Sequence, residues 1–180
     1  MRLLLLSGST RRGSTNTAVL RTAQAVAPPD VQAVLYAGLA DLPAFDPDAD
    51  TDPLPAEVAR LRGELAAADA VLLCTPEYAG GLPGSFKNLL DWTVGGTQLS
   101  DLPVGWVNAA SVAAPSGGAG AITGLATVLG YVGARVVEAA CVRLPVSRDA
   151  VGADGTVTDP GARAAIAGAV QALARAAGTG

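Results

Sequence analysis

Short apolar runs alternate with longer alanine-rich segments along the chain, and this alternation constrains the fold more than any other sequence feature. We expect β-strands at the apolar runs 2–7, 31–36, 69–75, 103–110 and 134–142. We expect helices at 15–27, 55–68, 84–94, 118–132 and 159–177. Runs such as RLLLLS and DAVLLCT are apolar on both faces, which is typical of central parallel strands covered by helices on two sides.

This strict alternation predicts an α/β fold, in which residues 1–180 form one three-layer, doubly wound domain around a five-stranded parallel sheet. Helix-end signals agree with it. Ser14 or Asn16 can cap the first helix, Pro55 sits where a first-turn proline is tolerated, and Asp159 precedes Pro160 as a cap for the last helix. Such sheets bind ligands beyond the carboxyl ends of their strands, so we expect a site in the loops after strands one, three and four.

Composition excludes several classes of function. The chain has no histidine, which rules out histidine-based triads, histidine–metal sites and imidazole proton relays. Its net charge is −4 and its basic residues are scattered, which argues against a nucleic-acid partner. The N-terminal apolar run is shorter than the roughly 7–15 residues of a signal-peptide core, and no stretch reaches the ~18 apolar residues of a membrane span. We therefore expect a soluble cytoplasmic protein without a membrane partner.

The two cysteines and an acidic run are expected to have structural rather than catalytic or metal-binding roles. Cys74 and Cys141 lie far apart within apolar stretches and are expected to be buried free thiols on strands. An acidic run has part of the spacing of a calcium loop: Asp46, Asp48, Asp50, Asp52 and Glu57. The run lacks the glycine such a loop needs and contains three prolines, so we expect no metal there but a solvated loop near the mouth of the site or a subunit contact.

The loop after the first strand reads GSTRRGSTN, from Gly8 to Asn16, and opens directly into a helix. Its glycines let the backbone wrap closely around a ligand, and its hydroxyl and amide side chains are short hydrogen-bonding groups. Arg11 adds a fixed positive charge, and the helix N-terminus adds a partial one. The loop favours binding of a phosphate dianion, with an ordinary capped turn as the alternative. It matches neither the G-x-G-x-x-G fingerprint nor a Walker P-loop.

The loop after the third strand begins TPEYAGGLPG and continues into SFKNLLDW, ending at Trp92. Its prolines and glycines fix an irregular backbone, and Tyr78 adds a flat apolar surface with a polar tip. These features suit an aromatic ring system. Glu77 could act as a general base, but we favour a carboxylate that fixes the loop by accepting hydrogen bonds from this chain or a second subunit. Trp92 is expected to pack rather than stack on a ligand.

The loop after the fourth strand reads NAASVAAPSGGAG, over residues 108–120. Its serines Ser111 and Ser116 and the pair Gly117–Gly118 can present backbone N–H groups to the edge of a ligand. A flexible alanine- and glycine-rich connection is the alternative interpretation.

Together the three loops resemble those of the NAD(P)H-dependent FMN reductases, a flavodoxin-fold family that includes quinone, azo-dye and chromate reductases. The resemblance spans nearly the whole chain, and the Pro-Glu-Tyr and Pro-Gly-x-x-Lys-Asn elements are its most specific part. It implies that NADPH or NADH reduces FMN, and that FMN passes electrons in ping-pong turnover to free flavin, a quinone, an azo compound or a metal oxyanion. The alternatives are a flavodoxin-like FMN-binding electron carrier without NAD(P)H oxidation, and a scaffold that has lost its flavin.

Carried over residue by residue, the resemblance implies three groups of cofactor-binding residues and no catalytic side chain, because the flavin carries the chemistry. The phosphate would be bound by Ser9, Arg11, Ser14, Thr15 and Asn16. The isoalloxazine ring would be bordered by Pro76, Glu77, Tyr78, Ala79 and Gly80. The pyrimidine side of the ring would meet Ser111, Gly117 and Gly118.

The chain departs from the family pattern at two places. Ala79 stands where the family usually has asparagine, so one side-chain contact near the flavin is lost. The helix after Gly118 has no arginine, where family members often carry one that bears on the choice between NADPH and NADH.

Apolar residues at the end of the second motif favour self-association. They exceed what one helix flank needs for its own core: Leu89, Leu90, Trp92 and Val94. We therefore expect a homodimer or homotetramer with this segment at the subunit contact near the flavin.

Overall fold

Five parallel strands form the centre of the computed structural model, which describes residues 1–111 and 114–178. The strands are β1 (Arg2–Ser7), β2 (Gln32–Leu35), β3 (Ala70–Cys74), β4 (Pro103–Asn108) and β5 (Arg135–Arg143). The helices are α1 (Thr15–Val26), α2 (Ala56–Ala66), α3 (Gly84–Asp91), α4 (Ala119–Tyr131) and α5 (Pro160–Ala177). All ten elements expected from the sequence are present, with ends that differ by a few residues. Within the described ranges, no helix is both long and apolar enough to cross a bilayer.

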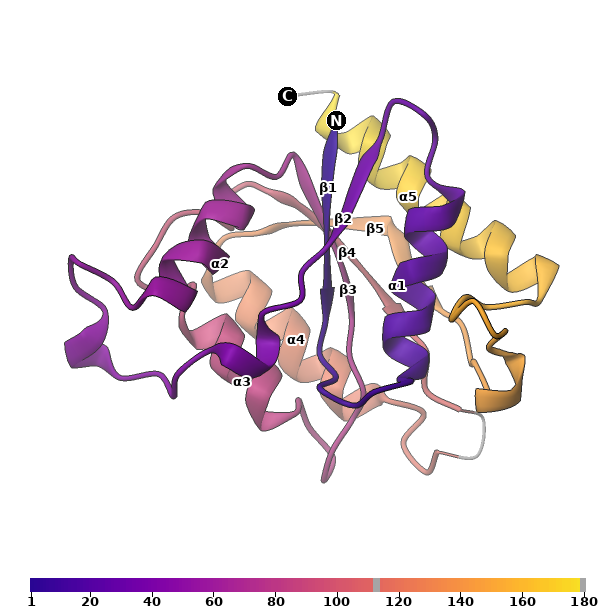
Figure 1. Cartoon of the computed structure of the whole chain (residues 1–180), viewed down its shortest axis with the longest axis horizontal. Helices are drawn as coiled ribbons and strands as arrows, with labels where there is room; N and C mark the ends of the chain where they lie inside the picture. The colour runs from indigo at the N-terminus through magenta and orange to yellow at the C-terminus, as the bar shows by residue number, and fades with distance from the viewer. Residues whose placement is uncertain (112–113, 179–180) are drawn as a thin grey trace.

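The sheet has the strand order β2-β1-β3-β4-β5, and every neighbouring pair is parallel. Helices α1 and α5 cover one face of the sheet, and α2, α3 and α4 cover the other (Figure 1). This order is that of flavodoxin-like doubly wound domains, in which ligands bind where the winding direction changes, here between β1 and β3. The predicted fold class is therefore confirmed.

The central strands are buried on both faces. Alternate residues of β1 point to opposite sides, so Leu3 and Leu5 pack in the core beneath α1 and α5. Leu4 and Leu6 pack in the second core, beneath α2, α3 and α4. Two apolar faces on one strand therefore require both helical layers, as the uninterrupted leucine run predicts.

The helix caps agree with the sequence, with one choice made by the structure. The Ser14 side chain accepts a hydrogen bond from the Asn16 amide at 3.2 Å, so Ser14 rather than Asn16 caps α1. Asp159 caps α5 as expected, accepting from the Ala162 amide at 2.7 Å. Pro55 is itself the N-cap residue of α2 rather than a residue of its first turn.

Both cysteines are free, and burial raises their thiol pKa values. Cys74 is fully buried on β3, where desolvation raises its pKa well above the ordinary range. Cys141 is half-buried on β5, and burial raises its pKa to about 11. Both groups are therefore neutral thiols at physiological pH, as expected for packing residues rather than nucleophiles.

The apolar residues at the end of α3 serve the core of the same chain. Leu89, Leu90 and Trp92 are fully buried, and the Trp92 indole donates to Pro43 O at 2.9 Å. Val94 alone among the four residues is exposed. We inferred a subunit contact because these side chains were taken to exceed what the core needs. That inference was wrong for these three side chains, because the connection between β2 and α2 folds over them. Self-association itself stays a prediction.

That connection is held to the body of the protein by an ion pair. Arg62 on α2 contacts Asp50 at 2.6 Å, with both side chains 11% exposed, and its Nε donates to Trp92 O at 2.9 Å. A second pair on the same helix, between Arg60 and Asp41 at 3.4 Å, has side chains that are 55% and 62% exposed. The two pairs differ mainly in their exposure to water.

This difference predicts unequal effects of one substitution. Asp50→Asn leaves a nearly buried guanidinium without its partner and should lower the free energy of unfolding by about 3 kcal/mol. Asp41→Asn, the matched control, should lower it by less than about 1 kcal/mol because water screens that pair. Urea denaturation followed by circular dichroism measures both values. Equal losses would contradict the assignment of Asp50 as the anchor of the connection.

Candidate functional site

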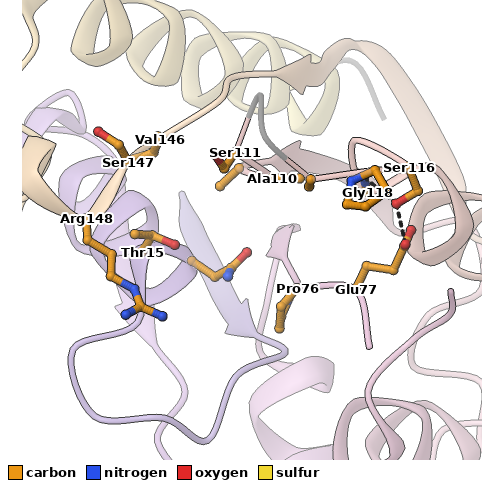
Figure 2. Close-up of a pocket in the computed structure, with 14 residues that line it drawn as sticks. Thr15, Pro76, Glu77, Ala110, Ser111, Ser116, Gly118, Val146, Ser147 and Arg148 are labelled. Carbon is orange, nitrogen blue, oxygen red and sulfur yellow. Dashed lines mark hydrogen bonds between the residues drawn. The ribbon is translucent and has the colours of Figure 1, made fainter. Parts of the chain in front are cut away.

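A cavity of about 430 Å3 opens at the edge of the sheet where the parallel strands end. Its walls come from the connections after four strands, β1, β3, β4 and β5, as Figure 2 shows. The volume is in the range of roughly 300–1,000 Å3 that small-molecule and cofactor sites occupy. A cavity is therefore present at the edge where the sequence predicts a site, with one more wall than the three predicted loops provide.

The structure brings part of the predicted set together in this cavity: Thr15, Asn16, Pro76, Glu77, Ser111 and Gly118. The other residues of the first loop line smaller pockets on its flanks, where Ser14 and Arg11 share one and Ser9 and Arg11 another. Gly117 lines a neighbouring cavity of about 400 Å3 beside β5. The remaining three, Tyr78, Ala79 and Gly80, form an exposed turn.

One end of the cavity is formed by the N-terminus of α1. The first turn of this helix contains no acidic residue, and the cap on Ser14 takes up the amide of Asn16. The Asn16 side chain is buried and its Oδ1 accepts a hydrogen bond from Cys74 Sγ at 3.3 Å, which orients the Nδ2 group as a donor. A helix N-terminus without an acid in its first turn suits an anion.

The opposite end is organised by Glu77. Its carboxylate accepts hydrogen bonds from the Ser116 hydroxyl and from the amides of Gly120 at 2.7 Å and Ala121 at 3.1 Å. These bonds, with the one from Ser116 contributing most, lower the pKa of Glu77. The carboxylate therefore stays ionised at neutral pH and ties the loop after β3 to the N-terminus of α4. The loop-fixing interpretation of Glu77 is confirmed, and its partners lie within the same chain.

The N-terminus of α4 packs directly against the loop after β3, which requires glycine at position 120. A Cβ atom on Gly120 would lie 2.0 Å from Gly80 O, which no side chain can tolerate. Gly118, just before the helix, has a φ of 82°, a left-handed conformation that glycine adopts without strain. The two glycines thus let both walls of this end of the cavity approach each other.

The turn at the tip of the loop after β3 shows what the backbone requires at position 79, where this chain has alanine and the family usually has asparagine. Tyr78 and Gly81 exchange two backbone hydrogen bonds of 3.0 Å, and the residues between them have positive φ values, 49° at Ala79 and 78° at Gly80. Such a two-residue turn favours Asn-Gly, because asparagine tolerates positive φ better than alanine. An asparagine at position 79 would therefore suit the backbone of this turn better than the alanine that is present.

The loop after β4 is shaped by Asn108, a residue that the sequence analysis did not single out. Its Nδ2 donates to Gly117 O at 2.8 Å, and its Oδ1 accepts from the Ala110 amide at 3.1 Å. The amides expected to meet a ligand are used within the loop: Gly117 N donates to Ala114 O at 3.0 Å, and Gly118 N to Ser116 Oγ at 3.2 Å. These amides of the loop therefore donate hydrogen bonds to other atoms of the same loop where it lines the cavity.

The connection after β5 forms the wall that the sequence analysis missed. It contributes Val146, Ser147 and Arg148, the last from the short helix η3 (Arg148–Ala150). A signal for it was present, since all strands of a parallel sheet end at the same edge and the chain leaves β5 there. The segment carries no glycine-rich or otherwise distinctive motif, so its contribution depends on how the chain returns over α1.

Comparison with known proteins places the chain among flavin-dependent reductases. The model of the NADPH-dependent FMN reductase family matches residues 1–148. An NAD(P)H-dependent FMN reductase of Pseudomonas aeruginosa is 31% identical over 176 residues, which cover 96% of this chain and 93% of that protein. A flavoenzyme of Paracoccus denitrificans, an NAD(P)H:acceptor oxidoreductase, superposes with a TM-score of 0.84 at 28% identity, covering 99% of this chain and 97% of the other.

A quinone reductase of Escherichia coli K12 is 35% identical over 105 residues, which cover 58% of this chain. The match spans only about half of that relative, 54% of its length. The family match and the near-complete alignment with the Pseudomonas aeruginosa protein confirm the resemblance carried by the three loops. This chain belongs to the NADPH-dependent FMN reductase family.

Proposed function

We propose that the protein is an FMN-dependent reductase that takes electrons from NADPH or NADH and passes them to a small acceptor. One observation carries the proposal: a single cavity joins the acid-free N-terminus of α1 at one end to the rigid wall around Glu77 at the other. These ends suit the two unlike parts of FMN, a phosphate dianion and an extended ring. Acceptors of the expected classes are free flavin, a quinone, an azo compound or a metal oxyanion.

The described residues fit FMN in a defined direction. Thr15, Asn16 and the first-turn amides of α1 would hold the phosphate, with Ser9, Arg11 and Ser14 around it. Pro76 and Ser111 would border the ring, with Gly118 at its far side. The negative charge of Glu77 does not repel the phosphate from its end of the cavity, because this carboxylate accepts hydrogen bonds from the amides at the N-terminus of α4.

The contribution of the protein to the reaction is positioning. Bound FMN supplies the hydride and electron chemistry, so a general acid or base on the protein is not required. Glu77 and Arg148 are the titratable side chains among the described cavity residues, and Glu77 is engaged by three donors. The walls of the cavity would hold the ring in place and leave one face open, where the coenzyme and then the acceptor could bind in turn, as ping-pong turnover requires.

Anaerobic mixing of the flavin-loaded protein with NADPH or NADH tests this function. We expect the visible absorbance of oxidised flavin to disappear rapidly, and a quinone or free flavin added afterwards to restore it. A flavin that binds but stays oxidised with both coenzymes would favour the electron carrier instead. A protein that stays colourless with added FMN would favour a scaffold without cofactor.

Glu77 should make the stability of the site dependent on pH. Because folding lowers its pKa, its stabilising contribution is full above the unfolded value of about 4.3 and is lost as pH falls through the lower folded value. Glu77→Gln should therefore lower the melting temperature at neutral pH, and this difference should shrink below about pH 4. Glu138→Gln, at an exposed position on β5, is the control and should have little effect at any pH. A Glu77→Gln deficit that is the same in acid and at neutrality would contradict the role given to the carboxylate.

We also propose that the protein is a homodimer or homotetramer. Its large exposed apolar side chains include Val94, 59% exposed, and Tyr131, 88% exposed at the end of α4. Helix α4 carries no charged residue, so its outer side offers no electrostatic barrier to a second copy. Light scattering at micromolar concentration should report the mass of two or four chains. The mass of one chain would contradict the proposal.

A further inference from the structure

One cation on the wall of the cavity has no protein partner. Arg148 is the one basic residue among the described residues that line the cavity, and Figure 2 draws it on the same side of the cavity as Thr15 of α1. Some arginines elsewhere in the described residues are paired with acids, such as Arg2 with Glu64 and Arg62 with Asp50. Within residues 1–111 and 114–178, the Arg148 guanidinium has neither an ion pair nor a hydrogen bond.

The fold places Arg148 there through anchors on both sides of η3. Before it, the chain continues along β4, where Leu144 N donates to Asn108 O at 2.8 Å, and the Val146 side chain is buried. After it, the Val157 amide donates to the hydroxyl of Thr22 on α1 at 2.8 Å, with Val157 itself buried. The connection is thus fixed to both β4 and α1, and η3 lies between these attachments, next to the start of α1.

Asp149, the neighbouring acid, forms no ion pair with Arg148 in the part of the chain that the structure describes. Asp149 accepts a hydrogen bond from the Ser147 side chain, which lowers the pKa of its carboxyl group. The first turn of α1 has no acidic residue, so a guanidinium and a helix N-terminus meet at one end of the cavity. At the other end, the Glu77 carboxylate is paired with the N-terminus of α4. A ligand with one dianionic end is therefore oriented with that end toward Arg148.

We propose that Arg148 binds the phosphate of the flavin from the cavity side, as a second guanidinium besides Arg11. The inference rests on the proposed function, and it adds a residue that lies outside the phosphate loop. Arg11 lines the pockets on the flanks of that loop rather than the cavity, so the two guanidinium groups approach the start of α1 from different sides. Arg148 thereby contributes to the preference for FMN over riboflavin, which has the same ring and no phosphate.

Binding of FMN and riboflavin to the full chain freed of flavin tests this role, with quenching of flavin fluorescence as the readout. Arg148→Ala should weaken FMN binding about 10-fold, the lower end for a charge-assisted hydrogen bond, because the side chain is exposed to solvent. Riboflavin affinity should change less than about twofold, since the lost contact is with the phosphate. Arg148→Lys should recover part of the loss. Arg175→Ala is the matched control, because Arg175 is an exposed arginine on α5 that does not line the cavity. This variant should bind both flavins as the wild type does.

Raised salt gives an independent check, because it should narrow the gap in FMN affinity between wild type and Arg148→Ala. Unchanged FMN affinity in Arg148→Ala, or equal weakening of FMN and riboflavin, would overturn the assignment.

Two further measurements show which claim fails. Unchanged FMN affinity together with weaker binding of 2′,5′-ADP to the flavin-loaded variant would also overturn the assignment, and it would indicate that Arg148 binds the coenzyme instead. A wild type that binds neither flavin would overturn the proposed function as well. A loss of FMN affinity in Arg11→Ala but not in Arg148→Ala would overturn the role of Arg148 alone.

Discussion

Burial of the central strands on both faces is the constraint on which the rest of this structure depends. Strands β1 and β3 present apolar side chains to two opposite cores, so helices must cover both faces of the sheet. The faces are then closed to a ligand, and the open place is the edge where the strands end. Residues separated widely along the chain, such as Thr15, Pro76 and Val146, meet there because parallel strands all end on the same side.

Two helix N-termini divide this edge into unlike halves. The positive end of α4 is neutralised by Glu77, whose hydrogen bonds also join two loops into one wall. The positive end of α1 has no acid in its first turn, and Arg148 adds a further positive charge near it. The difference between the two ends gives the cavity a direction. This difference supports the proposed orientation of FMN, with its anionic end at α1 and its ring toward the wall around Glu77.

Rigidity in this site comes from backbone contacts more than from side chains. Gly120 lies so close to Gly80 O that no Cβ fits between them, and Asn108 binds the loop after β4 at both its start and its end. Flavin chemistry needs a ring held in a fixed place rather than a protein acid or base. A chain without histidine is compatible with this, because the flavin would carry the chemistry and the protein would position it. The exposed turn at Ala79 is the strained part of this frame, since alanine there has a positive φ.

The sequence by itself determined the succession of strands and helices along the chain, the cap at Asp159, and the edge of the sheet where a site was expected, and it narrowed the cap of the first helix to Ser14 or Asn16. These follow from local periodicity, local hydrogen bonds and the geometry common to parallel sheets. The tertiary structure alone decided which long-range contacts form. The Trp92 indole donates to Pro43, the partners of Glu77 lie about 40 residues away, and the connection that carries Arg148 is fixed both to β4 and to Thr22 of α1. No spacing rule links such residues, because the distance between them in space is set by how whole elements pack.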